Sequence, residues 1–90
     1  MNSTTPQLID KDIVERAMHL TPYDIDHALL HSGFRPLRSV SATFLGIMGN
    51  RSFAYETTFV DDLGETITGR VYVSVVQKPI TEAFYFIAKY

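Results

Sequence analysis

The sequence contains no cysteine, which excludes a disulfide scaffold, a thiolate zinc site and a cysteine nucleophile. It also lacks a long apolar run, so we expect no transmembrane helix. No basic segment leads into an apolar core near residue 1, so we expect no signal peptide. The net charge of −2 gives no electrostatic reason to expect a nucleic-acid or anionic-membrane partner. These absences favour a cytoplasmic protein without a membrane partner.

What is present is typical of one folded domain. Hydrophobic residues make up 46% of the chain and charged residues 20%, a balance that suits a packed core and not a disordered segment. Ninety residues leave no room for a second core. Residues 1–7 are polar and without periodicity, so we expect a flexible leader followed by a single α+β domain over residues 8–90.

Two helices are predicted in the first third of the chain. In the first, apolar residues recur at helical spacing over residues 13–20. Asp10 or Asp12 can cap this helix, and Asp12 with Glu15 three residues later resembles a capping box.

The second helix is predicted from Pro22 to about Ser32. Thr21 is a good N-cap residue, and Pro22 suits the first helical position. Gly33 suits the left-handed conformation that ends many helices, after which Phe34 can fold back onto the last turn. We expect the two helices to pack as a bent pair.

Beyond residue 37 the apolar period changes from 3.6 to 2, which indicates strands. Gly49–Asn50 has the composition of a two-residue type II′ hairpin turn. This turn would pair Met48 with Arg51, Phe44 with Tyr55, Ala42 with Thr57 and Val40 with Phe59. The polar face of this hairpin would then hold Ser39, Ser41, Thr43, Glu56 and Thr58.

A second turn is predicted at Asp61 to Glu65, with Gly64 in the left-handed position. It would pair Asp61 with Glu65, Phe59 with Ile67, Thr58 with Thr68, Glu56 with Arg70, Tyr55 with Val71 and Phe53 with Val73. Lys78–Pro79 breaks the third strand, and residues 81–89 form a fourth whose register the pattern leaves open, because both of its faces are apolar. A two-residue loop at Lys78–Pro79 would place Phe84 and Phe86 with the valines of the third strand.

The predicted architecture is a two-layer α+β sandwich in the order ααββββ. Two N-terminal helices pack on one face of a four-stranded antiparallel meander.

One group of residues has a metal-ligand spacing. Asp24, His27 and His31 project from one face of the second helix, and two histidines four residues apart beside a carboxylate can chelate zinc or nickel. His19 would be a fourth ligand if the helices packed with those faces together. A solvated helix face that happens to use histidine explains the same pattern, so we assign no metal and keep these residues as a weak candidate site.

The sequence offers no motif for catalysis and none for a cofactor. No serine lies in a nucleophile elbow, and no glycine-rich loop opens a helix to hold phosphate. Glu56 opposite Arg70 would be held in its ionised form, the reverse of what a general acid needs. We therefore expect a protein that is not an enzyme.

Nucleic-acid binding is the second hypothesis. Arg35, Arg38 and Arg51 give residues 34–60 a local positive charge, and two of them flank the corner between the second helix and the first strand. Asp24 and Asp26 oppose a recognition-helix interpretation, because they lie in the first turn of the second helix and repel phosphate.

Binding to another protein is the leading hypothesis. Apolar and tyrosine side chains fall on the solvent side of the predicted third and fourth strands or off the core stripe of the second helix, and these candidates are Tyr72, Val76, Tyr85, Ile87, Tyr23 and Leu30. The last strand is also expected to be an open sheet edge. The partner would be another protein or a second copy of the chain, bound through the sheet edge or the face of strands three and four. Single domains of this size commonly act as inhibitors, immunity proteins, adaptors or phage- and plasmid-type anti-defence factors.

Overall fold

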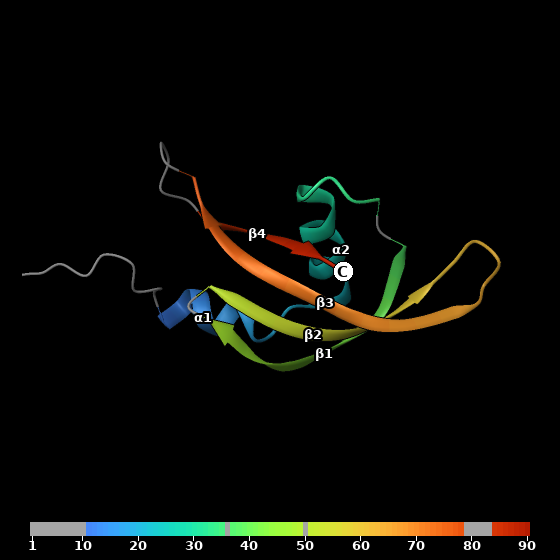
Figure 1. Ribbon diagram of the computed structural model, residues 1–90, viewed down its shortest axis with the longest axis horizontal. Coiled ribbons are helices and arrows are strands. Elements are labelled where there is room, and N and C mark those ends of the chain that lie inside the picture. Colours follow the sequence, from blue (N-terminus) through green and yellow to red (C-terminus); the bar gives the residue numbers. More distant parts are fainter. Residues whose placement is uncertain (1–10, 36, 50, 79–83) are drawn as a thin grey trace, which may run out of the picture.

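The computed structural model describes residues 11–35, 37–49, 51–78 and 84–90. Two helices, α1 (Lys11–Ala17) and α2 (Pro22–His31), precede four strands, which are β1 (Arg38–Gly49), β2 (Ser52–Val60), β3 (Thr66–Gln77) and β4 (Phe84–Lys89) (Figure 1). The strands form one antiparallel sheet in the order β1-β2-β3-β4. The predicted α+β architecture, in the order ααββββ, is therefore confirmed. The predicted leader, residues 1–7, lies outside the described residues.

Both ends of α2 are fixed by the residues that the sequence indicated. Thr21 and Asp24 form a reciprocal capping box, in which the Asp24 N–H donates to Thr21 Oγ1 at 3.1 Å and the Thr21 N–H donates to Asp24 Oδ2 at 2.9 Å. Gly33 has φ +88°, and the Phe34 N–H then donates to the Leu29 carbonyl at 3.0 Å. This pattern closes the helix as a Schellman motif.

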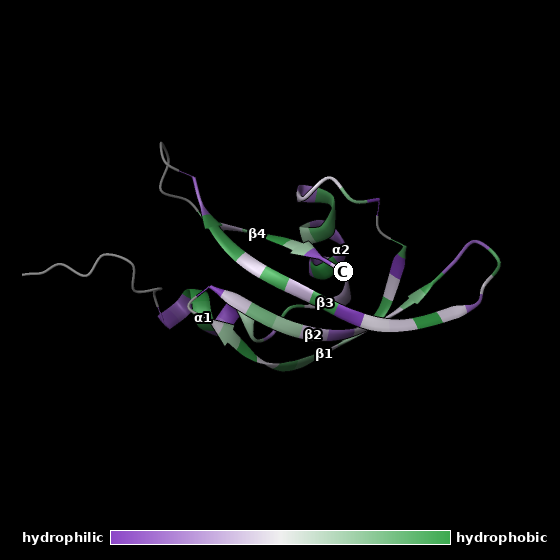
Figure 2. Cartoon of the chain, in the orientation of Figure 1, coloured by the Kyte–Doolittle hydropathy of each residue, from purple (hydrophilic) through white to green (hydrophobic). Residues whose placement is uncertain are grey.

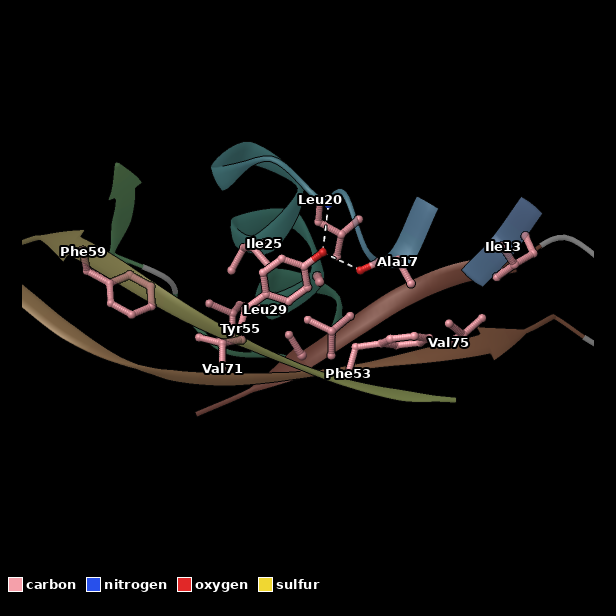
Figure 3. Packing of buried hydrophobic residues seen from close by; sticks show 13 residues of the cluster. Ile13, Ala17, Leu20, Ile25, Leu29, Phe53, Tyr55, Phe59, Val71 and Val75 are labelled. Atoms are coloured by element: carbon pink, nitrogen blue, oxygen red, sulfur yellow. Dashed lines mark hydrogen bonds between the residues drawn. The ribbon is translucent and has the colours of Figure 1, made fainter. Parts of the chain in front are cut away.

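The first helix is shorter than its apolar pattern and starts differently. Lys11 is already helical, so Asp12 lies inside the first turn and is not the N-cap, while Asp10 lies outside the described residues. The helix ends at Ala17 because the Tyr55 hydroxyl donates to the Ala17 carbonyl oxygen and accepts a hydrogen bond from the Leu20 N–H (Figure 3). A side chain from β2 therefore replaces the next intrahelical hydrogen bonds.

The β2–β3 hairpin has the predicted register throughout. Gly64 has φ +81°, the Asp61 N–H donates to the Glu65 carbonyl at 2.9 Å, and all of the expected cross-strand pairs of this hairpin are present. The turn accommodates three acids because Asp61 Oδ1 accepts hydrogen bonds from the Leu63 and Glu65 N–H groups. This hairpin extends past the helices (Figure 1).

The β1–β2 register is correct in the middle and wrong at the Arg38 end. Phe44 pairs with Tyr55 and Ala42 with Thr57 as predicted, but Phe59 pairs with Ser39 and not with Val40. A register shift between Ser39 and Ser41 turns Ser39 toward the helices. There it is buried, and its N–H and hydroxyl donate to the two carboxylate oxygens of Asp26 at 3.0 and 2.5 Å.

The predicted Gly49–Asn50 turn is also wrong. Gly49 pairs with Ser52, so Met48 does not pair with Arg51. Gly49 is not among the described glycines with positive φ, which are Gly33 and Gly64, whereas the first residue of a type II′ turn requires it. Asn50 itself lies outside the described residues.

The register of β4, which the sequence left open, pairs Gln77 with Phe84, Val75 with Phe86 and Val73 with Ala88. Phe86 faces a valine as expected, but Phe84 does not. Six residues separate Gln77 from Phe84, so a two-residue loop at Lys78–Pro79 is wrong. The expected strand residues 81–83 lie outside the described residues.

We call the helix-covered side of the sheet the inner face and the other side the outer face. Hydropathy alternates along much of β3, as expected for a strand with one buried face (Figure 2). The core joins α1 and α2 to inner-face residues, and among the described strands its buried members are Phe53, Tyr55, Phe59, Val71, Val73, Val75 and Ala88 (Figure 3).

Candidate functional site

A cluster of large apolar side chains lies on the outer face of β3 and β4. We call it the outer patch, and its members are Tyr72, Val76, Tyr85 and Ile87. Val76 lies directly opposite Tyr85, and Ile87 lies opposite Ser74, midway between the two β3 members of the patch. The register therefore brings together the four strand residues that the sequence suggested for a protein interface.

The outer patch takes no part in the core. Each of its four side chains is half-buried, and in the described part of the chain every strand residue of the core cluster comes from the inner face. Ala54, cross-strand from Tyr72, is 3% exposed, so small neighbours on this face are shielded by the larger side chains. The helices thus leave an apolar surface of the sheet without a covering layer.

Cationic side chains flank the outer patch. Arg70 is two residues before Tyr72 on the same face, and Lys89 lies directly opposite Tyr72 on β4. Lys78 places its Nζ 5.4 Å from the centre of the Tyr85 ring. These three cations were not among the site residues predicted from the sequence. The period of β3 was enough to find Arg70 and Lys78, whereas Lys89 also required the register of β4.

The two helical candidates, Tyr23 and Leu30, are exposed on α2 and do not belong to the outer patch. Their side chains are 70% and 58% exposed, and their seven-residue spacing places them on one face of the helix. A series of ring contacts connects this face to the sheet. Ring centres are 5.0 Å apart for Tyr23 and His27, 5.4 Å for His27 and His31, and 5.5 Å for His31 and Tyr85.

The last strand is an edge, as predicted, but the end of α2 covers part of it. His31 Nδ1 lies 3.1 Å from the Phe86 carbonyl oxygen, and the Ala88 N–H donates to Ser32 Oγ at 3.1 Å. Side chains of α2 therefore bind backbone groups that an open edge would offer to a new strand. The expectation of an open edge at β4 is wrong to that extent.

The other edge strand, β1, is protected in a different way. Its pairing with β2 has three register shifts, which interrupt the regular ladder. Bulged edges oppose the addition of a further strand. Both edges therefore disfavour a homodimer formed by edge-to-edge pairing.

In the weak candidate metal site, the Asp24 carboxylate is already engaged in hydrogen bonds. Asp24 Oδ2 accepts hydrogen bonds from the Thr21 N–H and hydroxyl, both at 2.9 Å. His27 and His31 pack edge to face at 75°, whereas a shared metal ion needs an in-plane nitrogen of each ring directed at one point. His19 lies 3.2 Å from Glu15. Among the described residues no three histidines or acids are grouped so as to hold a metal ion.

The three arginines of the nucleic-acid hypothesis do not form one surface. Arg38 lies opposite Val60 at one end of β2, while Arg51 precedes Ser52 at the other end. The length of β2 separates them by about 30 Å. Only Arg35 and Arg38 remain near one another, at the corner between α2 and β1.

A shallow groove of about 360 Å³ runs between α2 and β4. Its lining includes Tyr23, His27 and His31 on one side and Phe84 and Tyr85 on the other. Arg16 crosses its end with the guanidinium carbon 5.6 Å from the centre of the Phe86 ring. The groove borders the outer patch through Tyr85.

Two described tyrosines, Tyr55 and Tyr90, have displaced pKa values. Burial raises the pKa of Tyr55, with a smaller contribution from Asp24, against the opposing hydrogen bond from Leu20. Burial also raises the pKa of Tyr90, whose ring packs against Phe34 and Phe59. Neither tyrosine belongs to the outer patch.

No family model, curated protein or solved structure matches this chain. No helix in residues 11–35, 37–49, 51–78 and 84–90 is long and apolar enough to cross a membrane.

Proposed function

We propose that this chain is a small, non-catalytic cytoplasmic protein that acts by occupying a surface of another protein. Inhibitors, immunity proteins, adaptors and phage- or plasmid-type anti-defence factors act in this manner. The observation that supports the proposal is the outer patch, where Tyr72, Val76, Tyr85 and Ile87 lie together on the uncovered face of the sheet.

The chemistry of the outer patch suits a protein interface. Tyr72 and Tyr85 each combine a large apolar ring with a hydroxyl that can stay hydrated at the rim of a contact. Val76 and Ile87 add aliphatic surface between and beside them. Burying such a cluster against apolar side chains of a partner removes its surface from water, and tyrosines are enriched among the residues that dominate binding energies.

A different protein fits this surface better than a second copy. In a symmetric dimer through the outer face, Arg70, Lys78 and Lys89 of one chain would face the same cations of the other, and like charges in an interface oppose association. Edge-to-edge pairing is opposed by the bulges of β1 and by the contacts of His31 and Ser32 with β4.

The test is capture from nuclease-treated lysate of the source cells by the tagged full chain at two salt concentrations. We expect one stoichiometric protein that the wild-type chain captures and that Tyr72→Ala, Tyr85→Ala and Ile87→Asp each capture less well. Leu63→Asp is the matched control, because Leu63 is 84% exposed in the β2–β3 turn, away from the outer patch. Equal capture by all variants, or no captured protein, contradicts the proposal.

A further inference from the structure

We infer that the outer face binds an acidic surface of its partner. This inference rests on the proposed function. The register places Arg38, Arg70 and Lys89 on the outer face, and Lys78 joins them above the Tyr85 ring. Glu56 is the one acidic residue on that face among the described residues. Four cations against one carboxylate give the described part of this face a charge of +3, while the whole chain carries −2.

The cations of the outer face lie where a partner must meet them. Lys89 lies opposite Tyr72, and Arg70 is the next residue on the same face of β3. Lys78 follows Val76 by two residues at the other end of the outer patch. Any protein that buries the outer patch therefore brings its own rim within a few ångströms of three positive charges. Carboxylates at that rim are attracted, and lysine or arginine there is repelled.

Apart from Glu56, the described acids lie off the outer face, which gives this face its separate charge. Asp61, Asp62 and Glu65 occupy the β2–β3 turn, and the other described acids, Asp12, Glu15, Asp24 and Asp26, lie on the helices, which pack on the inner face. At physiological ionic strength, interactions between exposed charges are largely screened beyond about 8 Å. An approaching surface therefore experiences the local positive field of the outer face and not the net charge of the chain. The same field steers an acidic partner toward this face during association.

The contacts of Tyr85 favour a protein over a single-stranded nucleic acid. Proteins that hold single strands stack bases on free aromatic ring faces. The Lys78 Nζ lies 5.4 Å from the Tyr85 ring centre, and the His31 ring packs against Tyr85 at 85°. This ring is already in contact with two side chains. Val76 and Ile87, beside it, have no group that could hydrogen-bond a base.

The experiment uses two probes of defined charge on the ¹⁵N-labelled full chain. Poly-L-glutamate represents an acidic protein surface, and an oligothymidylate of equal charge represents a nucleic acid. Amide chemical shifts are followed during each titration at low ionic strength and again at about 0.15 M salt, where the weaker charge interactions are screened. We expect poly-L-glutamate to shift amides of Arg70, Tyr72, Lys78 and Lys89, with at least a several-fold loss of affinity at the higher salt.

Matched charge reversals separate the outer face from net charge. Lys78→Glu combined with Lys89→Glu should abolish the poly-L-glutamate shifts. Lys11→Glu combined with Arg35→Glu should leave them within about twofold, although it changes the net charge equally, because both residues are exposed and lie off the outer face. Equal loss in both double variants, or shifts centred on the helices, overturns the inference. Tighter binding of the oligothymidylate to the same amides overturns it in favour of a nucleic acid.

These outcomes are distinct from those of the capture experiment. If Ile87→Asp loses the captured protein while the Lys78→Glu and Lys89→Glu double variant retains it, the proposed function stands and the acidic partner is wrong. If the charge reversals abolish the poly-L-glutamate shifts but no outer-patch variant affects capture, the positive face is real and the proposed function is wrong.

Discussion

The Tyr55 hydroxyl accepts a hydrogen bond of 2.9 Å from the backbone N–H of Leu20, a residue that lies between the two helices. The same hydroxyl donates to the carbonyl oxygen of Ala17 at the end of α1 (Figure 3). Because Tyr55 projects from the inner face of β2, these bonds hold the helix connection against that face. The outer face is left without a helix layer, and this asymmetry is the structural origin of the candidate site.

Removal of the Tyr55 hydroxyl should destabilise the fold. Tyr55→Phe keeps the buried ring but leaves the Leu20 N–H and the Ala17 carbonyl without this partner in a buried environment. The free energy of unfolding should fall by about 1–3 kcal/mol, as measured by urea denaturation at pH 7. Tyr23→Phe removes a hydroxyl from a side chain that is 70% exposed. It should change the free energy of unfolding by less than about 0.5 kcal/mol. Equal effects of the two substitutions would contradict this role of Tyr55.

Stability should also decline at alkaline pH in a way that depends on Tyr55. Burial raises the pKa of this phenol in the folded state above the value of about 10 expected for the unfolded chain. Below pH 10 the phenol is neutral in both states, so the stability that the Tyr55 side chain contributes is fully present. As the pH rises toward the folded pKa, the unfolded state loses its proton first and folding is disfavoured. Urea denaturation from pH 8 to 11 should show a steeper decline for the wild-type chain than for Tyr55→Phe, and parallel curves would exclude this contribution.

The buried hydroxyl of Thr57 should be dispensable. Thr57 is fully buried on the inner face, and its Oγ1 has no hydrogen-bond partner in the part of the chain that the structure describes. Thr57→Val keeps the side-chain shape and removes the cost of burying an unpaired hydroxyl, so we expect a gain of about 1 kcal/mol. Thr43→Val, at an exposed position, is the control. A loss of stability in Thr57→Val, measured by thermal denaturation, would show that the hydroxyl has a partner after all.

The protection of the β4 edge can be tested at one amide. In Ser32→Ala the Ala88 N–H loses the hydroxyl that accepts its hydrogen bond at 3.1 Å. We expect hydrogen exchange of the Ala88 amide to accelerate by at least about tenfold through local opening, while the Val73 amide in the centre of the sheet is unchanged. If the Ala88 amide exchanges at the wild-type rate in Ser32→Ala, the α2 contact does not protect this edge.

Local rules were sufficient for the elements whose ends are set by their own residues. The N-cap at Thr21, the left-handed residue at Gly33 and the turn at Gly64 depend on side chains or glycines within a few positions, and all three were predicted. The capping box was predicted for Asp12 and Glu15, but the structure has it at Thr21 and Asp24. The β2–β3 register followed from one such turn. The outer position of Tyr72 and Val76 came with that register, because side chains alternate along a strand.

Tertiary contacts decided what the sequence pattern missed. The register shift at Ser39 exists together with its hydrogen bonds to Asp26, thirteen residues earlier on another element. α1 ends where Tyr55, 38 residues away, binds Ala17. The cover over β4 depends on His31 and Phe86, which are 55 residues apart. Periodicity within a window does not include contacts over such separations, so the register at Ser39, the end of α1 and the cover over β4 could not be predicted from it.

Whether the outer patch binds a protein is tested by the affinity of the captured protein for two matched variants. Isothermal titration calorimetry would compare Ile87→Asp in the outer patch with Leu63→Asp in the β2–β3 turn, after circular dichroism has shown that both are folded. We expect Ile87→Asp to weaken binding by at least about 30-fold, the effect of losing a dominant interface residue, and Leu63→Asp to leave the affinity within about twofold. Equal affinities for Ile87→Asp and the wild-type chain would contradict the claim.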